Sequence, residues 1–120
     1  MHKFKDLEIW KISRILCSSI YGATKDFPQE EKFGITNQMR RASVSIPSNI
    51  AEGASRKSNK DFCRFLEIAI GSCYELETQL IISNDLGFLE QNRLEPLLAE
   101  LNKVTMMTSK FISTLKARDK

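Results

Sequence analysis

The stretch from Thr36 to Arg56, TNQMRRASVSIPSNIAEGASR, constrains the fold most, because its polar and apolar residues recur with a helical period. At about 100° per residue, an apolar stripe and a polar stripe run side by side along one helix. The apolar stripe holds Met39, Ala42, Ile46, Ile50 and Gly53, and the polar stripe holds Gln38, Arg41, Ser45, Asn49, Glu52 and Arg56. The pattern predicts a helix that begins near Asn37, with Thr36 as its N-cap.

Pro47 lies in the middle of this predicted helix. A proline there removes one backbone hydrogen bond to Ser43 and crowds the same carbonyl, at a cost of about 3 kcal/mol. Small neighbours such as Ser45, Ser48 and Ala51 let the helix bend, and serine hydroxyls can satisfy the freed backbone groups. We therefore expect one kinked helix through Pro47 and not two separate helices.

Three further segments repeat the helical period and are separated by short polar corners. They run from Asp6, as N-cap, to about Lys25; from Ser58, which fits a capping box with Asp61, to a stop at Gly87; and from about Gln91 to Lys116. The 120 residues are enough for one domain. The sequence thus predicts a single all-α domain over residues 1–120, an antiparallel up-and-down four-helix bundle with a kinked second helix.

The predicted third helix is apolar around most of its circumference. Its apolar residues are Phe62, Phe65, Leu66, Ile68, Ala69, Ile70, Cys73, Tyr74, Leu76, Leu80, Ile81 and Ile82. Such a helix in so small a protein has to be covered from more than one side. We therefore expect it to form an interface in a homo-oligomer.

Composition argues against an enzyme, a metal site and a bound cofactor. The single histidine, His2, stands near the N-terminus, so the pattern offers no base for a nucleophile and no metal-ligand cluster. Cys17, Cys63 and Cys73 lack CxxC spacing and are predicted to be small buried hydrophobes. No apolar run is long enough for a membrane span, and MHKFKDLEIW carries charges where a signal peptide needs an apolar core, so we expect a cytoplasmic protein.

Charge becomes uneven once antiparallel helices gather particular segments at each end. Residues 3–11, 56–64 and 110–120 carry eleven Lys and Arg against four Asp and Glu, a balance of +7, and we call this end the basic pole. Residues 20–36 and 80–96 carry three against six, a balance of −3. A basic pole attracts polyphosphate, although a merely solvated surface is the alternative. The candidate nucleic-acid-binding residues are Lys3, Lys5, Arg56, Lys57, Lys60, Arg64 and Lys116.

The polar stripe of the central helix allows two interpretations. Arg41, Asn49 and Glu52 form either a binding site or a buried polar network that fixes how helices pair. Glu75 and Glu77 of the third helix are available to the arginines of the central helix. We favour a structural network of these five residues.

The segment QMRRASVSIPSNIAEGASRKS, preceded by DLEIWK, IYGATKDFP and EEKFGIT and followed by FCRFLEIAIGSCYELETQL and LGFL, carries a family resemblance. From Phe4 to Lys116 the chain resembles the bacterial 23S rRNA intervening-sequence proteins. The resemblance implies a cytoplasmic homopentamer of up-and-down bundles arranged as a barrel. The family name describes genes that lie in insertions within 23S rRNA genes, which is a genomic position and not evidence of ribosome binding.

Two functions compete, and a third is disfavoured. The first is an oligomeric protein that binds structured RNA or DNA through the basic pole, with Arg56, Lys57, Lys60 and Arg64 as phosphate contacts. Because aromatic residues are scarce there, recognition would be of backbone and shape. The second is an oligomeric scaffold that binds another protein. An enzyme would rest on the polar stripe alone, without a nucleophile-base pair or a phosphate-binding glycine loop.

Overall fold

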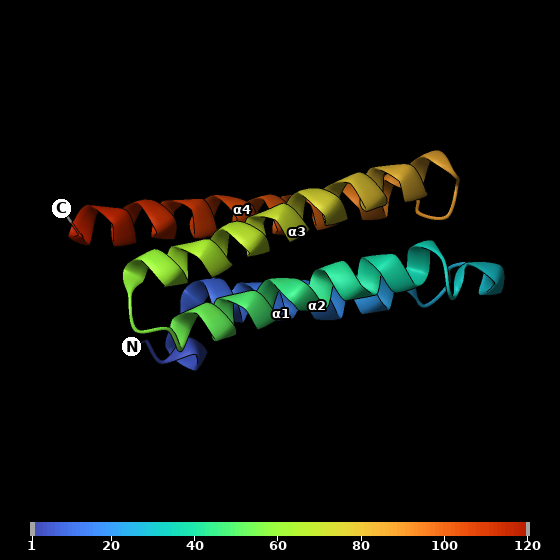
Figure 1. Ribbon diagram of the computed structural model, residues 1–120. Coiled ribbons are helices and arrows are strands. Elements are labelled where there is room, and N and C mark those ends of the chain that lie inside the picture. The colour runs from blue at the N-terminus through green and yellow to red at the C-terminus, as the bar shows by residue number, and fades with distance from the viewer. Residues whose placement is uncertain (1, 120) are drawn as a thin grey trace.

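The computed structural model describes residues 2–119, which form four long helices. These are α1 (Glu8–Thr24), α2 (Ile35–Ala54), α3 (Asn59–Asp85) and α4 (Gln91–Arg118), with short 3₁₀ turns at Phe4–Asp6 and Gln29–Glu31. Figure 1 shows that successive helices alternate in direction, as the sequence predicts. The molecule measures 48 × 23 × 20 Å. Its long axis is close to the length of α3 or α4 at about 1.5 Å per residue.

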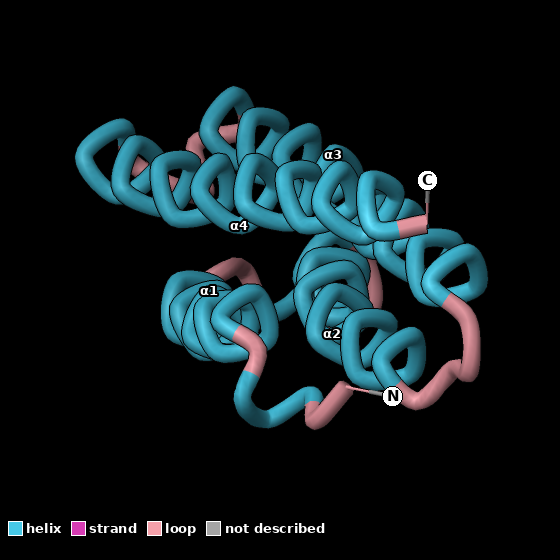
Figure 2. Tube along the Cα trace, turned by 90° about the vertical axis from the view of Figure 1, so that its left-hand side faces the viewer, coloured by secondary structure: helices cyan, strands magenta, loops and turns pink. Residues whose placement is uncertain are grey.

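Each helix packs against its neighbour in sequence, and α1 also packs against α4. Figure 2, in which α1 and α2 are seen nearly end-on, shows these two helices in one layer and α3 and α4 in the other. The core is filled from all four helices by Leu16, Ile20, Met39, Ile46, Ile50, Leu66, Leu76, Leu80, Val104 and Leu115, all almost fully buried. Met39, Ile46 and Ile50 belong to the apolar stripe predicted for α2, so the helical period identified the core face of that helix.

The central helix α2 continues without interruption through Pro47. This confirms the prediction of one helix, while the kink at Pro47 stays a prediction. The hydroxyls of Ser43 and Ser45 donate to the carbonyls of Arg40 and Ala42, each at 2.8 Å. Both serines therefore satisfy their own hydroxyls within the turn before the proline.

Gly53 marks a close approach between α2 and α3. A Cβ atom added there would lie 2.7 Å from Cβ of Phe65 and 2.8 Å from Cδ1 of Phe62. Carbon atoms in contact prefer about 3.5 to 4.0 Å, so only glycine fits without a shift of the helices. This contact sets how the start of α3 sits against the end of α2, and so positions the corner that carries Arg56 and Lys57.

Two predicted helix starts were wrong. Thr36 is not the N-cap of α2, because the helix begins at Ile35 after Gly34, and Thr36 lies buried within the first turn. Asp6 does not cap α1, because it belongs to the 3₁₀ turn at Phe4–Asp6, and Leu7 precedes the helix. In both places the chain enters its helix from a preceding tight turn, whose backbone determines where the helix begins.

The start and end of α3 follow the prediction closely. The Ser58 hydroxyl accepts a hydrogen bond from the Asp61 N–H at 3.1 Å, which is the predicted N-cap. Gly87, with φ of 78°, follows the end of the helix at Asp85 in the left-handed region that favours glycine. The last helix extends to Arg118, slightly beyond the predicted Lys116.

The three cysteines are free thiols, and Cys63 and Cys73 are buried as predicted, whereas Cys17 is half-buried. Over residues 2–119, no helix combines the length and the apolar character that crossing a bilayer requires. In the same part of the chain, no three His, Cys, Asp or Glu side chains cluster closely enough to hold a metal ion.

Candidate functional site

The basic pole is assembled from three separate stretches of the chain. Figure 1 shows the N-terminal segment, the corner between α2 and α3, and the C-terminal end of α4 at the same end of the bundle. The backbone N–H of His2 donates to the Ala54 carbonyl at 3.2 Å, and Asn59 Nδ2 donates to Asp119 Oδ1 at 3.0 Å. The predicted gathering of these segments is therefore confirmed. Lys120, which the charge count includes, lies outside the described residues.

An aromatic cluster holds the N-terminal segment against this end of the bundle. The His2 ring lies 5.0 Å from the ring of Phe62 and 6.0 Å from that of Phe111, measured between centroids. Burial against these rings lowers the pKa of His2, because the charged imidazolium loses hydration there. The neutral ring thus packs as an aromatic side chain and anchors the segment that carries Lys3 and Lys5.

All seven predicted nucleic-acid-binding residues are exposed. Lys60, Arg64 and Lys116 line one pocket, whereas Lys3, Lys5 and Lys57 lie outside it. Arg56 is the most constrained of the seven, since its guanidinium stacks 4.7 Å from the Phe65 ring centroid and pairs with Glu52 at 3.2 Å.

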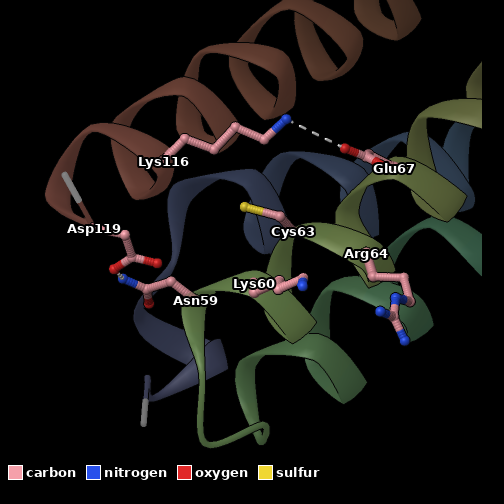
Figure 3. A pocket seen from close by; sticks show the side chains of 7 residues that line it. All are labelled: Asn59, Lys60, Cys63, Arg64, Glu67, Lys116 and Asp119. Atoms are coloured by element: carbon pink, nitrogen blue, oxygen red, sulfur yellow. Dashed lines mark hydrogen bonds and ion pairs between the residues drawn. The ribbon is translucent and has the colours of Figure 1, made fainter.

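The pocket that holds three of these cations lies between the start of α3 and the end of α4 (Figure 3). We call it the terminal pocket. It has a volume of about 440 Å³ and is lined by Asn59, Lys60, Cys63, Arg64, Glu67, Lys116 and Asp119. Burial raises the pKa of the Cys63 thiol, and the nearby Lys116 ammonium only partly opposes this effect. The thiol therefore stays protonated at neutral pH and is not poised as a nucleophile.

Four residues of the terminal pocket were not predicted from the sequence. Asn59, Cys63 and Glu67 stand at four-residue steps on α3. The helical period places them on one face beside Lys60 and Arg64, so this signal was present in the sequence. The fourth, Asp119, directly follows α4, which ends at Arg118 and not at the predicted Lys116.

The predicted polar network does not form within the single chain. Arg41, Glu52, Glu75 and Glu77 are exposed, and Asn49 is half-buried. Among residues 2–119, the ion pairs within 4.0 Å do not join Arg41 to either glutamate of α3. Asn49 Nδ2 donates to the Ser45 carbonyl of its own helix at 2.8 Å. A role for these residues in an assembly of several chains stays a prediction.

A different polar contact links α2 to α3. The hydroxyls of Ser45 and Ser72 lie 2.6 Å apart, and both residues line a groove of about 620 Å³ between the two helices. Arg41 and Glu75 line the same groove, together with the exposed Phe33 and the half-exposed Ile68. Ser72 was not among the predicted site residues, because its segment was interpreted as an apolar helix.

Fold and charge together define a class of protein: a single up-and-down four-helix bundle whose exposed cations are concentrated at one end. The chain belongs to the 23S rRNA-intervening sequence protein family, whose model matches residues 5–110. This match confirms the resemblance that the motif around Pro47 indicates.

The bundle is also similar to a solved crystal structure, that of a protein with unknown function from the S23 ribosomal protein family of Bacteroides thetaiotaomicron VPI-5482. The two structures superpose with a TM-score of 0.78 at 20% sequence identity, over 87% of this chain and 97% of the other. At this identity the similarity supports the fold alone. No curated protein matches this chain.

Proposed function

We propose that this protein is a non-enzymatic, cytoplasmic homo-oligomer that binds structured RNA, or another nucleic acid, through its basic pole. The observation that carries the proposal is the gathering of exposed lysines and arginines from three distant segments at one end of the bundle. Lysine and arginine side chains that neutralise phosphates release counterions, which makes binding favourable and dependent on salt. The aromatic residues of the pole, such as Phe62 and Phe111, are buried or half-buried and pack against one another, so the contacts would be to backbone and shape.

Exposed apolar residues on α3 support self-association. Ile68, Tyr74, Ile81 and Ile82 have exposed fractions of 50%, 58%, 43% and 42%, and Leu86 follows at the end of the helix with 57%. Several large apolar side chains left open along one helix are unusual for a monomer and mark an interaction surface. We infer that copies of the chain cover this surface, and the family resemblance implies a homopentamer.

Ring symmetry would strengthen the basic pole. In a cyclic assembly whose axis runs along the bundles, every copy points the same way, so all basic poles meet on one face. The fields of neighbouring poles then add within a Debye length of about 8 Å at physiological salt. The groove that holds Arg41 and Glu75 is the candidate polar part of the contact between copies, because both side chains are exposed in the single chain.

Salt-dependent binding provides the test. We would measure the affinity for a fluorescent RNA hairpin, and for the matching DNA hairpin, between roughly 50 and 200 mM salt. The double variant Lys57→Gln with Lys60→Gln should lower the salt slope by roughly 0.7 to 0.9 for each phosphate that is no longer neutralised. The control, Lys25→Gln with Lys32→Gln, removes the same charge from the opposite pole, where both lysines are exposed. Equal effects of the two variants, or no retention of either hairpin at low salt, would refute the proposal.

A scaffold that binds another protein is the second candidate, and a separate groove favours it. Leu7, Ile9, Met107 and Phe111 line an apolar groove of about 320 Å³ between α1 and α4. A pull-down that recovers one defined protein after nuclease treatment, and no longer recovers it with Met107→Lys, would favour this function. Recovery of nucleic acid alone would favour the first.

A further inference from the structure

The terminal pocket differs from the rest of the basic pole because it is concave and draws its charge from two helices. Lys60 and Arg64 come from the first turns of α3, and Lys116 comes from the last turns of α4 (Figure 3). Other cations of the pole, such as Lys3 and Lys5, are exposed on the surface and do not line this volume of about 440 Å³. The pocket therefore offers an anion charge from more than one side.

The charges of the pocket are only partly neutralised by the chain itself. Two carboxylates line it: Glu67 pairs with Lys116 at 3.6 Å, and Asp119 Oδ1 accepts a hydrogen bond from Asn59 Nδ2 at 3.0 Å. Within residues 2–119, the ion pairs closer than 4.0 Å leave Lys60 and Arg64 without an acidic partner. The lining thus carries three cations against two carboxylates, an excess of one positive charge.

The pair of Lys116 and Glu67 is easily exchanged for a bound anion. Both side chains are more than half exposed, at 62% and 58%. Exposed ion pairs contribute about 0 to 1 kcal/mol in general, so Lys116 can turn from Glu67 to a ligand with little loss. Asn59 has a second amide N–H that its bond to Asp119 does not use.

We propose that the terminal pocket binds a phosphomonoester, and specifically the phosphorylated end of a nucleic-acid strand. This inference rests on the proposed function of the basic pole and specifies which group of the nucleic acid enters the pocket. A terminal phosphate carries a charge of about −1.5 to −2 at pH 7 and three acceptor oxygens. A phosphodiester within a strand carries one charge and has a sugar on both sides, so it presents less charge and fewer free oxygens to the pocket than a terminal phosphate does.

The residues at the centre of the terminal pocket and the residue at its rim have different binding roles. Lys60 and Lys116 supply charge from the two helices, Asn59 supplies a neutral donor, and Cys63 forms an uncharged floor between them. In Figure 3 the Arg64 guanidinium points away from Lys116, which places it at the rim of the pocket. We therefore expect Lys60 and Lys116 to distinguish a phosphorylated end from an unphosphorylated one. Arg64 should add the same affinity for both.

The test compares two RNA strands of one sequence, each labelled at the 3′ end, one with a 5′-phosphate and one with a 5′-hydroxyl. The wild-type protein should bind the phosphorylated strand on the order of tenfold more tightly, since hydrogen bonds to a charged group are among the stronger ones. The double variant Lys60→Gln with Lys116→Gln should bind the two strands with equal affinity. The control, Lys3→Gln with Lys5→Gln, removes equal charge from the same pole and should weaken both strands while keeping the ratio.

The outcomes separate this inference from the proposed function. Tight binding of both strands with a ratio near one, unaffected by Lys60→Gln with Lys116→Gln, overturns the end-binding site and leaves binding by the basic pole standing. If neither strand binds, the proposed function falls, and titration with adenosine monophosphate and inorganic phosphate decides whether the pocket takes phosphomonoesters at all. Binding of these small anions that the pocket variant abolishes supports the pocket, and no binding overturns it. Circular dichroism of each variant checks that these exposed substitutions leave the fold intact.

Discussion

The close approach of α2 and α3 at Gly53 gives a sharp test of the packing that positions the basic pole. The substitution Gly53→Ala adds one methyl group at a point where its carbon would lie 2.7 Å from Cβ of Phe65 and 2.8 Å from Cδ1 of Phe62. The Phe65 carbon is bonded directly to the backbone, so that side chain cannot rotate out of the way. The helices themselves have to separate.

Two opposing effects determine the change in the free energy of unfolding. Replacing glycine by alanine inside a helix stabilises it by about 0.5 to 1 kcal/mol. Overpacking a well-filled contact costs about 1 to 3 kcal/mol. Gly22, inside α1, has nothing within 4 Å of an added Cβ, so Gly22→Ala receives the helical gain without the steric cost. The difference between the two variants isolates the steric cost, and we expect Gly53→Ala to be less stable than Gly22→Ala by about 1 to 3 kcal/mol.

Urea unfolding followed by circular dichroism measures this difference, with the slope m compared across wild type and both variants. All three proteins have to be studied at one chain concentration, because self-association adds to apparent stability. Gly22→Ala should unfold at a higher urea concentration than wild type, and Gly53→Ala at a lower one than Gly22→Ala. If the two variants gain stability equally, α2 and α3 are not in close contact at Gly53, and this glycine does not position the corner.

Three further predictions concern burial, assembly and pH. Thr36→Val should stabilise the protein by about 1 kcal/mol, because the buried Thr36 hydroxyl has no hydrogen-bond partner among the described residues and valine keeps its shape; a loss of stability in urea unfolding would contradict this. Ile68→Lys with Ile82→Lys should shift the sedimentation coefficient from that of an oligomer towards that of a 13.7 kDa monomer, whereas Lys103→Gln on the exposed face of α4 should not. The pKa of His2 in the folded state is lowered below 6.5, so the unfolded state binds more protons than the folded state as pH falls. The free energy of unfolding should therefore drop as pH falls through 6.5, and it should stop dropping once pH is below the lowered pKa. His2→Gln should flatten that part of the stability-pH curve, and an unchanged curve would argue against burial of this ring.

The four helices could be predicted because each has a long amphipathic face, and the period of that face depends only on helix geometry. Met39, Ile46 and Ile50 of α2 were predicted as one stripe and are all fully buried. Pro47 did not divide the helix, since a helix packed on two sides retains enough stabilisation to offset one missing hydrogen bond. Packing along a whole helix outweighs a single unfavourable residue.

Helix starts were harder to predict, because local signals compete there with the preceding chain. Ser58 was correctly predicted as an N-cap, because it lies at an exposed corner where its hydroxyl is free to accept a hydrogen bond from the first turn of α3. Thr36 carries the same kind of hydroxyl, yet the burial of this residue within α2 takes that hydroxyl away from the helix end. A capping residue in the sequence is thus a more reliable signal at an exposed corner than at a position that the fold buries.

The helical period groups the residues of α2 into two stripes, but it does not determine which neighbouring helix each stripe faces. Helical spacing correctly grouped Arg41, Ser45 and Asn49 on one side, but their roles depend on how α2 is rotated about its own axis against α3. In the structure this rotation brings Ser45 against Ser72, with 2.6 Å between their hydroxyls, and leaves Arg41 exposed. Within the single chain, a short contact between two hydroxyls therefore links the helices in place of the predicted polar network, and it costs far less to desolvate than a buried charge.

α3 has more apolar residues than the fold of the single chain buries. The bundle buries Leu66, Leu76 and Leu80 completely, yet it leaves Ile68 and Ile82 about half exposed on the same helix. Single exposed apolar residues are ordinary, but a run of them along one helix is more than the fold of one chain requires. The apolar residues that the bundle does not bury are thus the part of the pattern on which the proposed self-association rests. If that copy aligns its bundle with the first, the same contact brings two basic poles and two terminal pockets onto one face, so loss of assembly should weaken nucleic-acid binding even in variants that keep every cation.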